Sequence, residues 1–363
     1  SGILFAGSLR IKEMARWIHD DCSDVFYRIK RLTHHLVAPR GDLAEVVGAY
    51  RQQCAPHIPA DTPLAIDLTD VAKPRARKMQ HLALVYDGSE DRLVSGYWCL
   101  EVYAKLSPKH ILPLALDVFS IDDPAVGSRN LQIDRTVRAI HRALNGKGIW
   151  VADRGFDGLE LYETWFSLNA HFVVRQRGDR CVVPAKGGHI RQSELVEHVR
   201  QAQMRAGRQT DILFTQVRLP GRNERLYLVA SWKPGCDHPL ILMTTLVVET
   251  LAQAQQIIWY YKQRWSCEEA GRFLKSRIGM ERFCVRGYKA IQRLMILAML
   301  AMGFLTWVLL RSKRLPQHLF AITSRFRKTP PFLYYRLLDG LQLFSSHNRL
   351  IAQQIPIALW ENG

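Results

Sequence analysis

The chain has 363 residues, of which 48% are hydrophobic and 10% aromatic; this excludes disorder throughout the chain and is enough for two or three domains. Lys and Arg together number 50 against 33 for Asp and Glu, which gives a formal net charge of +17 at pH 7. Such an excess of cations favours a polyanionic partner, with a merely basic soluble protein as the alternative.

Apolar side chains recur at helical spacing through residues 8–56, with breaks at 39–41 and at Pro56. This pattern predicts a small helical N-terminal region, residues 1–62.

Between residues 63 and 177 the pattern changes to short apolar runs that are typical of strands, with two stretches at helical spacing. We expect strands at 63–68, 81–87, 95–106, 111–120, 148–153 and 171–176, and helices at 128–145 and 159–168. Strands followed by alternating helices and strands indicate the α/β class, with a mixed sheet flanked by helices.

Residues 178–247 are rich in β-type residues and carry tight-turn signals at 187–188, 219–224 and 233–239. They predict an antiparallel β insertion with one helix around 192–204. After residue 248 we expect helices to near residue 345, including a basic C-terminal region, residues 313–363.

One apolar run, LMILAMLAMGFLTWVLL at 294–310, lies between Arg293 and Arg311. Its length is at the short edge of a membrane span, and a buried helix of a large domain shows the same composition. We favour the buried helix because strongly basic segments lie on both sides of the run.

The seven cysteines (22, 54, 99, 181, 236, 267 and 284) are scattered, odd in number and without a CxxC pair. This usage predicts reduced thiols in a cytosolic compartment, with neither a disulfide framework nor a zinc site.

The cations are concentrated in particular segments. Residues 73–78 read KPRARK, with four cations in six positions. Residues 262–293 hold nine Lys and Arg against three Glu, whereas residues 1–62 are nearly balanced, with eight cations against seven acids. A surface that follows a chain of phosphates requires such a concentration.

Two aspartates end apolar runs: Asp67 closes PLAID and Asp153 closes GIWVAD. A buried strand holds the residue at its end rigidly, which suits a metal ligand or an acid–base group. The alternative is turn chemistry, which often places Asp after a strand. Asp70, expected one step into the basic loop, competes with Asp67, and Asp157 competes less strongly with Asp153.

Residues 261–275, YKQRWSCEEAGRFLK, place two glutamates in a basic stretch flanked by aromatic residues. On one helix at about 100° per residue, a single face would carry Tyr261, Arg264, Glu268, Arg272 and Lys275. The alternative is a solvated face with ion pairs between Glu268 and its neighbouring arginines.

The two glutamates have different expected roles. Ser266 and Glu269 form an S-x-x-E capping box, which would restart the helix at Ser266. With or without that restart, Glu268 is the residue for chemistry, and Glu269 serves capping or faces solvent.

Two Asp and one Glu among Lys, Arg and aromatic residues suit phosphodiester cleavage. Its transition state carries extra negative charge, which two divalent cations about 4 Å apart can stabilise. Mg²⁺ binds oxygen ligands, and a few carboxylates suffice because water and substrate phosphate complete its shell. Nearby cations hold the other phosphates in register.

The spacing Tyr261-(2)-Arg264-(3)-Glu268-(6)-Lys275 resembles the Y-(2)-R-(3)-E-(6)-K signature of bacterial IS4-type transposases. IDLTD around Asp67 and ADRGFDG around Asp153 resemble the segments that carry the first and second catalytic aspartates of that family. The resemblance covers roughly residues 63–312.

The resemblance implies an RNase H-like catalytic domain with a DDE triad, in which Asp67, Asp153 and Glu268 are catalytic and bind two Mg²⁺ (or Mn²⁺) ions. It implies that the enzyme cuts the terminal inverted repeats of its element and joins them to target DNA, as a homodimer in the active complex. The residues expected to contact DNA are Tyr261, Arg264, Lys275, Arg272 and Lys73.

The expected domains are the helical region 1–62, with a possible role at DNA ends, the catalytic segments 63–177 and 248–312, the β insertion 178–247, and region 313–363. The expected compartment is the bacterial cytoplasm, at the nucleoid. The alternatives are a nuclease of the same fold without strand transfer, an inactive DNA-binding remnant of an element, and a membrane protein.

Overall fold

The computed structural model describes most of the chain. It covers residues 2–18, 24–38, 41–88, 90–207, 211–233, 235–236, 238–312, 314–323 and 332–347. Some predicted features lie outside these residues: Cys22, Ser89 of one turn, Pro234 and Asp237 of another, and residues 324–331 and 348–363 of the C-terminal region.

The chain divides into two compact units. Unit 1 contains Ser1–Cys54, Leu68–Gln132 and Ser266–Gly363, and unit 2 contains Ala55–Asp67 and Ile133–Trp265. The described strands form a mixed sheet of 11 strands accompanied by helices, which confirms the predicted α/β class and is consistent with an RNase H-like fold. Strand β1 (Pro63–Ala72) contributes its first half to unit 2 and its second half to unit 1.

Unit 2 combines parallel and antiparallel strands. The first half of β1 pairs in parallel with β5 (Ile149–Ala152), which pairs in parallel with β6 (His171–Arg175). Antiparallel strands follow in the order β11 (Leu240–Thr244), β10 (Leu226–Ser231), β9 (Ile212–Arg218), β7 (Cys181–Pro184) and β8 (Ile190–Arg191). Helix α7 (Gln192–Arg205) lies in this span, where a single helix was expected.

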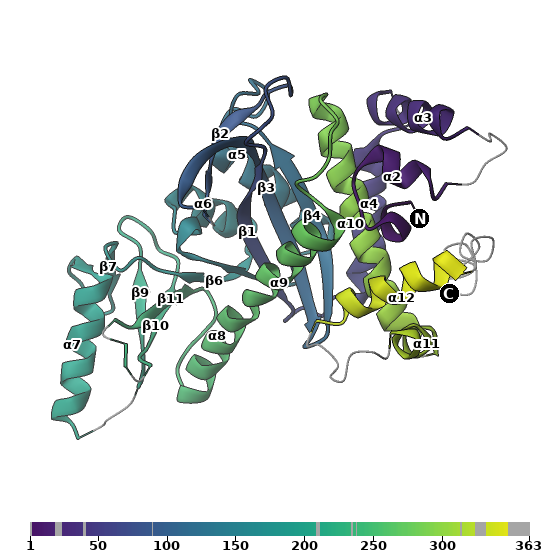
Figure 1. Cartoon of the computed structure of the whole chain (residues 1–363). Coiled ribbons are helices and arrows are strands. Elements are labelled where there is room, and N and C mark those ends of the chain that lie inside the picture. The colour runs from purple at the N-terminus through teal and green to yellow at the C-terminus, as the bar shows by residue number, and fades with distance from the viewer. Residues whose placement is uncertain are drawn as a thin grey trace. The chain divides into compact units, whose positions relative to one another are not determined.

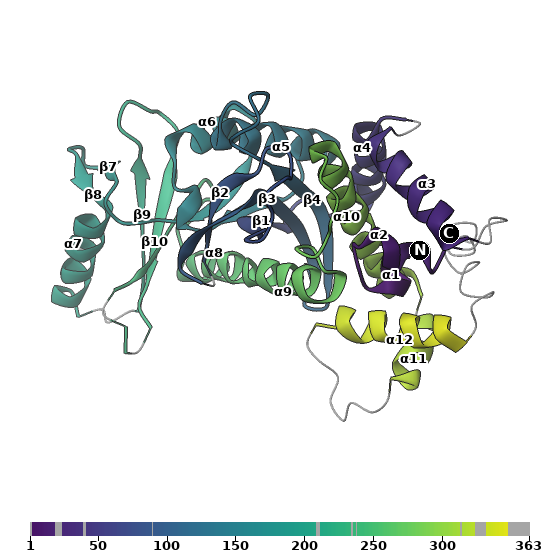
Figure 2. The same ribbon diagram turned by 45° about the horizontal axis from the view of Figure 1, so that its top comes forward.

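The helices of unit 2 pack through specific contacts. Helices α5 (Arg129–Ala143) and α6 (Leu159–Ser167) lie side by side (Figure 2), and the Thr164 hydroxyl donates to Asp134 Oδ1 at 2.6 Å. Trp165 of α6 stacks on Phe172 of β6 with 4.9 Å between ring centroids. Helix α8 (Leu251–Gln263) begins with a capping box of Thr250 and Gln253.

In unit 1, β2 (Ala83–Asp87), β3 (Arg92–Ser107) and β4 (His110–Phe119) form an antiparallel group. Helix α10 (Tyr288–Arg311) runs along β4 (Figure 1). At one end Gln292 Nε2 donates to Val118 O at 3.2 Å, and at the other the Thr306 hydroxyl donates to Ile111 O at 2.8 Å.

Helix α10 contains the apolar run 294–310, whose length is near that of a membrane span. It is long and apolar enough to cross a membrane by length and composition, yet 56% of its most apolar window is buried inside the protein. Leu294, Ala298 and Met302 are fully buried in unit 1. The structure therefore supports the predicted buried helix, since more than half of this apolar window is buried within the protein.

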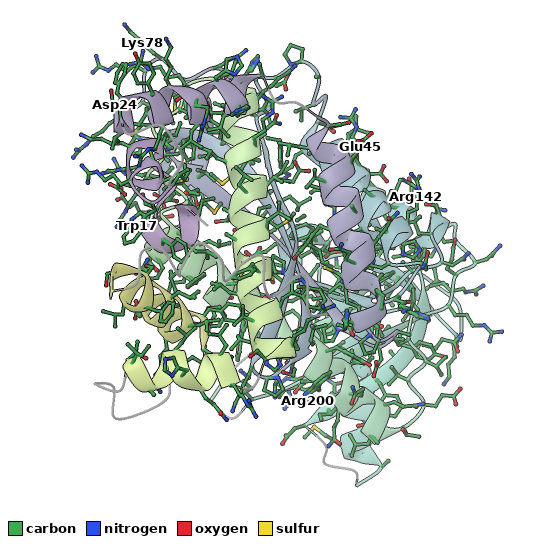
Figure 3. All side chains as sticks on the ribbon, turned by 90° about the vertical axis from the view of Figure 1, so that its right-hand side faces the viewer. Trp17, Asp24, Glu45, Lys78, Arg142 and Arg200 are labelled. Carbon is green, nitrogen blue, oxygen red and sulfur yellow. The ribbon has the colours of Figure 1, made fainter. Side chains whose placement is uncertain are left out.

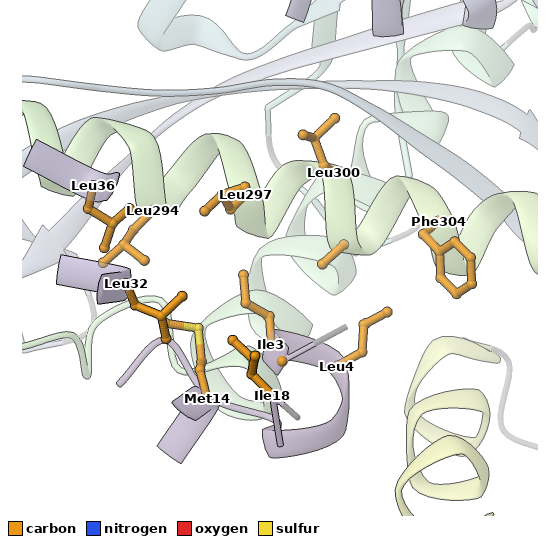
Figure 4. Close-up of a pocket in the computed structure, with 12 residues that line it drawn as sticks. Ile3, Leu4, Met14, Ile18, Leu32, Leu36, Leu294, Leu297, Leu300 and Phe304 are labelled. Carbon is orange, nitrogen blue, oxygen red and sulfur yellow. The ribbon is translucent and has the colours of Figure 1, made fainter. Parts of the chain in front are cut away.

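The N-terminal region of unit 1 is helical, as predicted, with α1 (Gly2–Ala6), α2 (Ile11–Ala15), α3 (Val25–Val37) and α4 (Leu43–Cys54). Between α1, α2, α3 and α10 lies an apolar cavity of about 350 Å³ (Figure 4). Its lining comprises Gly2, Ile3, Leu4, Met14, Ile18, Leu32, Leu36, Leu294, Leu297, Leu300, Ala301 and Phe304.

The C-terminal helices of unit 1 are α11 (Arg314–Ile322) and α12 (Tyr334–His347). The buried Tyr334 hydroxyl joins α12 to β4, because it donates to Ile111 O at 2.7 Å and accepts from Ile111 N at 2.9 Å. The same hydroxyl lies 3.1 Å from Thr306 Oγ1, so α10, α12 and β4 meet at one buried polar point.

Gly303 of α10 allows a close approach of α4. A methyl group on Gly303 would overlap the buried Tyr50 hydroxyl, which donates to Pro113 O at 2.8 Å. Gly303→Ala is therefore expected to lower the free energy of unfolding by about 1–3 kcal/mol, measured by urea denaturation. Gly48→Ala is the matched control, because Gly48 lies within α4 and a methyl there meets nothing within 4 Å. This control should raise stability by about 0.5–1 kcal/mol, and equal effects of the two changes would contradict the packing argument.

Candidate active site

The parallel pairing of three neighbouring strands stops at the same level in unit 2. The register pairs Ile66 of β1 with Ala152 of β5, and Ala152 with Val174 of β6. The next residues along these strands are Asp67, Asp153 and Arg175. Because adjacent strands lie about 4.8 Å apart and paired residues point to the same face, the register places the two aspartates side by side with an arginine next to them.

Both aspartates are accessible, since the Asp67 and Asp153 side chains are 32% and 31% exposed. Arg175 Nη1 lies 3.8 Å from Asp153 Oδ1, and the backbone N–H of Arg154 donates to the same oxygen at 2.6 Å. The Tyr261 hydroxyl also donates to Asp153 Oδ1, at 3.4 Å. Each of these contacts is made to Oδ1 of Asp153.

Two members of the predicted signature contact the aspartates. Tyr261 lies on α8, and Arg264 is the first residue after that helix. The φ of −55° and ψ of −33° at Arg264 are helical. Arg264 Nη1 lies 3.7 Å from Asp67 Oδ2. Tyr261 and Arg264 are both only 6% exposed, so they face the carboxylates and not an open surface. Burial and the charge of Asp153 raise the pKa of Tyr261, which keeps it a hydrogen-bond donor.

Asp157, the weaker competitor of Asp153, has a structural environment. Its side chain is only 1% exposed, and Oδ1 lies 2.8 Å from Arg180 Nη2. The Tyr162 hydroxyl donates to Oδ1 at 3.0 Å, and the Arg177 N–H donates to Oδ2 at 3.2 Å. Both oxygens are therefore committed inside the fold, which favours Asp153 as the accessible carboxylate of the pair.

The position of Asp70 differs from the prediction. Strand β1 does not end at residue 68 but continues to Ala72, so Asp70 lies within a strand and not in a loop. Asp67 is likewise inside β1, although its pairing with β5 stops at Ile66. Side chains three residues apart on a strand point to opposite faces of the sheet, so Asp67 and Asp70 do not point to the same face.

Asp70 has the signature lysine as its partner in unit 1. Lys275 Nζ lies 3.3 Å from Asp70 Oδ1 and 3.0 Å from Glu281 Oε1. Burial alone would lower the pKa of Lys275, but the carboxylates of Glu281 and Asp70 outweigh it and raise that pKa. Lys275 thus stays charged at neutral pH.

Glu268 lies on α9 (Trp265–Phe273) of unit 1. The buried side of α9 carries Cys267, Ala270 and Phe273, whereas Glu268 is exposed. Gly271 lets α9 approach β3, because a Cβ there would lie 3.2 Å from Oε2 of the buried Glu101. This close packing fixes which side of α9 faces β3 and leaves Glu268 on the exposed side.

The single helix expected over 261–275 is wrong, and so is the capping box. Helix α8 ends at Gln263, α9 begins at Trp265, and a π-helical turn spans Leu274–Ile278. Because α9 begins before Ser266, that serine cannot be its N-cap, and Glu269 instead pairs with Arg272 at 2.5 Å. Lys275 lies in the π-helical turn, where 100° per residue no longer applies.

Lys73 is the other expected DNA contact whose surroundings differ from the prediction. It is only 7% exposed, and its ammonium donates to Glu281 O at 2.6 Å and Phe283 O at 2.8 Å. Burial lowers its pKa to about 8. The Lys73 side chain therefore fastens the basic loop to another segment and is not presented to a ligand, whereas Arg272 is 64% exposed at its side chain.

The donor set of unit 2 suits a hard divalent cation. Mg²⁺ is commonly held by one or two carboxylates, with water and phosphate oxygens completing the shell. Asp67 and Asp153 provide two accessible carboxylates on a rigid edge of the sheet. In the described ranges, no three His, Cys, Asp or Glu side chains are gathered closely enough to hold a metal by themselves.

Sequence reasoning missed Arg175 as a member of this site. The sequence contained a signal for it, since the strand HFVVR ends in Arg175 and β6 pairs in parallel with β5. Cations at the carboxyl ends of neighbouring parallel strands meet carboxylates at the same edge of the sheet.

In this α/β fold, Asp67 and Asp153 directly follow the last parallel pair of β1 and β5, Ile66 and Ala152. The sequence matches the family described as "Transposase DDE domain" over residues 59–304. This match covers more than half of the 363 residues, and the chain belongs to that family. A search of curated proteins gave no match.

Proposed function

We propose that this protein is a DNA transposase of the IS4 type that cleaves the ends of its element and joins them to target DNA. The observation that carries the proposal is the register of β1, β5 and β6, which aligns Asp67, Asp153 and Arg175 at one edge of unit 2. The family match supports it, because the matched residues include both aspartates and Glu268.

Asp67, Asp153 and Glu268 would hold two Mg²⁺ (or Mn²⁺) ions. Bound there, the ions would supply an activated water or DNA 3′-OH and would stabilise the leaving oxygen. Glu268 is exposed on α9 and is the Glu of the Tyr261-(2)-Arg264-(3)-Glu268-(6)-Lys275 spacing. This spacing supports Glu268 as the third acid.

The surrounding residues have separate roles in the proposal. Arg175 and Tyr261 orient Asp153, and Arg264 orients Asp67, since each contacts its carboxylate at 3.4–3.8 Å. They would also contact DNA once the scissile phosphate reaches the aspartates. Lys275 and the exposed Arg272 would bind backbone phosphates near the cut. We further propose that the protein acts as a homodimer in the bacterial cytoplasm, at the nucleoid.

A joining assay tests the proposal. The purified protein is incubated with Mg²⁺, a supercoiled plasmid and a duplex that carries the DNA flanking the coding region with a free 3′-OH. We expect covalent insertion of the duplex into the plasmid and its loss with EDTA. Cleavage without joined product would identify a nuclease, and DNA binding without either reaction would identify an inactive remnant.

A further inference from the structure

A second charged feature lies within unit 1. It is a cavity of about 500 Å³ between the loop 72–79 and the segment 281–286. Five cations line this basic pocket against a single carboxylate, Glu281, which is already paired with Lys275 at 3.0 Å. The two segments are about 200 residues apart in the chain, so the pocket exists only in the folded protein.

The first end of the loop is fixed by Lys73. Its buried ammonium donates to Glu281 O and Phe283 O, at 2.6 and 2.8 Å, and lies 3.4 Å from the centroid of the Phe283 ring. The backbone N–H of Lys73 also donates to Ser95 O at 2.7 Å. One cation of the KPRARK stretch is therefore used to build the pocket.

The other end of the loop is fixed by Gln80. Its backbone N–H donates to Arg286 O at 3.0 Å, and its carbonyl accepts from the Tyr97 hydroxyl at 2.6 Å. Its side-chain oxygen accepts from Tyr288 N at 3.1 Å. Because both ends are held, the residues between them need little further ordering when a ligand binds.

The remaining cations of the loop are available to a ligand. Arg75, Arg77 and Lys78 are exposed, and none has a side-chain partner within the described part of the chain. Lys78 points outward from the ribbon (Figure 3). Arg286 adds an exposed cation from the opposite segment. A group of cations held close together without paired carboxylates is suited to bind the phosphates of a polyanion.

We propose that this basic pocket binds the sugar–phosphate backbone of duplex DNA, at phosphates adjoining the one contacted by Lys275. The link is Glu281, which lines the pocket and holds Lys275. The inference rests on the proposed function, because it adds a second phosphate-binding site to the same DNA. Arginine and lysine contacts to phosphate carry no sequence information, so the pocket contributes affinity and register and not sequence specificity.

The test is the salt dependence of DNA binding, measured by fluorescence anisotropy with a duplex of arbitrary sequence. Each lost phosphate contact lowers the slope of log Kobs against log salt concentration by about 0.9. The triple variant Arg75→Ala, Arg77→Ala, Lys78→Ala should therefore lower the slope by about 2–3. Lys275→Ala should lower it by about 1.

A charge-matched control removes three exposed arginines from α5: Arg129→Ala, Arg135→Ala, Arg142→Ala. This control should change the slope by less than about 0.5, since it lacks a proposed phosphate contact. If the loop triple variant resembles the α5 control while Lys275→Ala keeps its effect, the pocket inference is wrong and the DNA function stands. If the wild-type protein binds no DNA, both the pocket inference and the proposed function fail.

Cys284 provides a second readout without mutation. It is exposed and lines the pocket, whereas Cys181 is exposed in unit 2. Saturating duplex should slow alkylation of Cys284 at least about tenfold and leave Cys181 unchanged, as followed by peptide mass spectrometry. Equal alkylation of Cys284 with and without DNA would overturn the proposed site.

Discussion

Replacing Glu268 by glutamine should lower the rate of DNA cleavage by about 10³-fold while duplex affinity stays within about threefold of wild type. The change removes the negative charge that would hold a divalent cation but keeps the size and polarity of the side chain. Glu268 lies on the exposed side of α9, so its substitution leaves the buried contacts of Cys267, Ala270 and Phe273 in place. Single-turnover cleavage and anisotropy measure the two quantities separately.

Glu269→Gln is the matched control for this prediction. Glu269 pairs with Arg272 on the helix surface, and exposed pairs of this kind contribute only a few tenths of a kcal/mol. We therefore expect a change in cleavage rate of less than about threefold. Similar losses in the two variants would show that the assignment of the chemical role within the glutamate pair is incorrect.

The second large effect concerns stability. Asp157→Asn should lower the free energy of unfolding by about 3 kcal/mol, because it breaks a buried ion pair and leaves Arg180 without its counter-charge. The Asp157 side chain is 1% exposed and that of Arg180 17% exposed, so little solvent screening relieves this loss. Urea denaturation followed by circular dichroism measures the change.

Asp153→Asn, four residues earlier, should give the opposite pattern. Its side chain is 31% exposed, and its ion pair with Arg175 is long, at 3.8 Å. We expect a change in unfolding free energy below about 1 kcal/mol together with loss of cleavage of about 10³-fold. If Asp157→Asn were the inactive, stable variant and Asp153→Asn the unstable one, the roles assigned to the two aspartates would be reversed.

The strands around the candidate site could be predicted because their residues are locally consistent. GIWVAD and HFVVRQ are short runs rich in β-branched and aromatic residues. Strand β5 forms within the first run and β6 within the second. The approximate position of Asp153 at a strand end followed from the same pattern. The sequence could not show that β1 continues beyond Leu68, because Thr69 and Asp70 are polar and the strand is extended by its place in the sheet.

The environments of the lysines could not be predicted for a different reason. Lys73 is buried by Glu281 and Phe283, more than 200 residues further along the chain, and no local pattern reports such a contact. The predicted orientation of Lys275 requires a regular helix, but the chain adopts a π-helical turn there. The S-x-x-E pattern at Ser266 was misleading because α9 already begins at Trp265, so Ser266 lies inside the helix and does not start it.

The packing of α10 on β4 has a consequence for protein synthesis. Strand β4 ends at Phe119, but the helix that covers it is complete only at Arg311, so a ribosome must add roughly 190 residues in between. At about 5–20 residues per second, the apolar surface of β4 would stay uncovered for roughly 10–40 s. Nascent chains would need chaperones during this interval, and a product of premature termination before α10 would be left to aggregation or proteolysis.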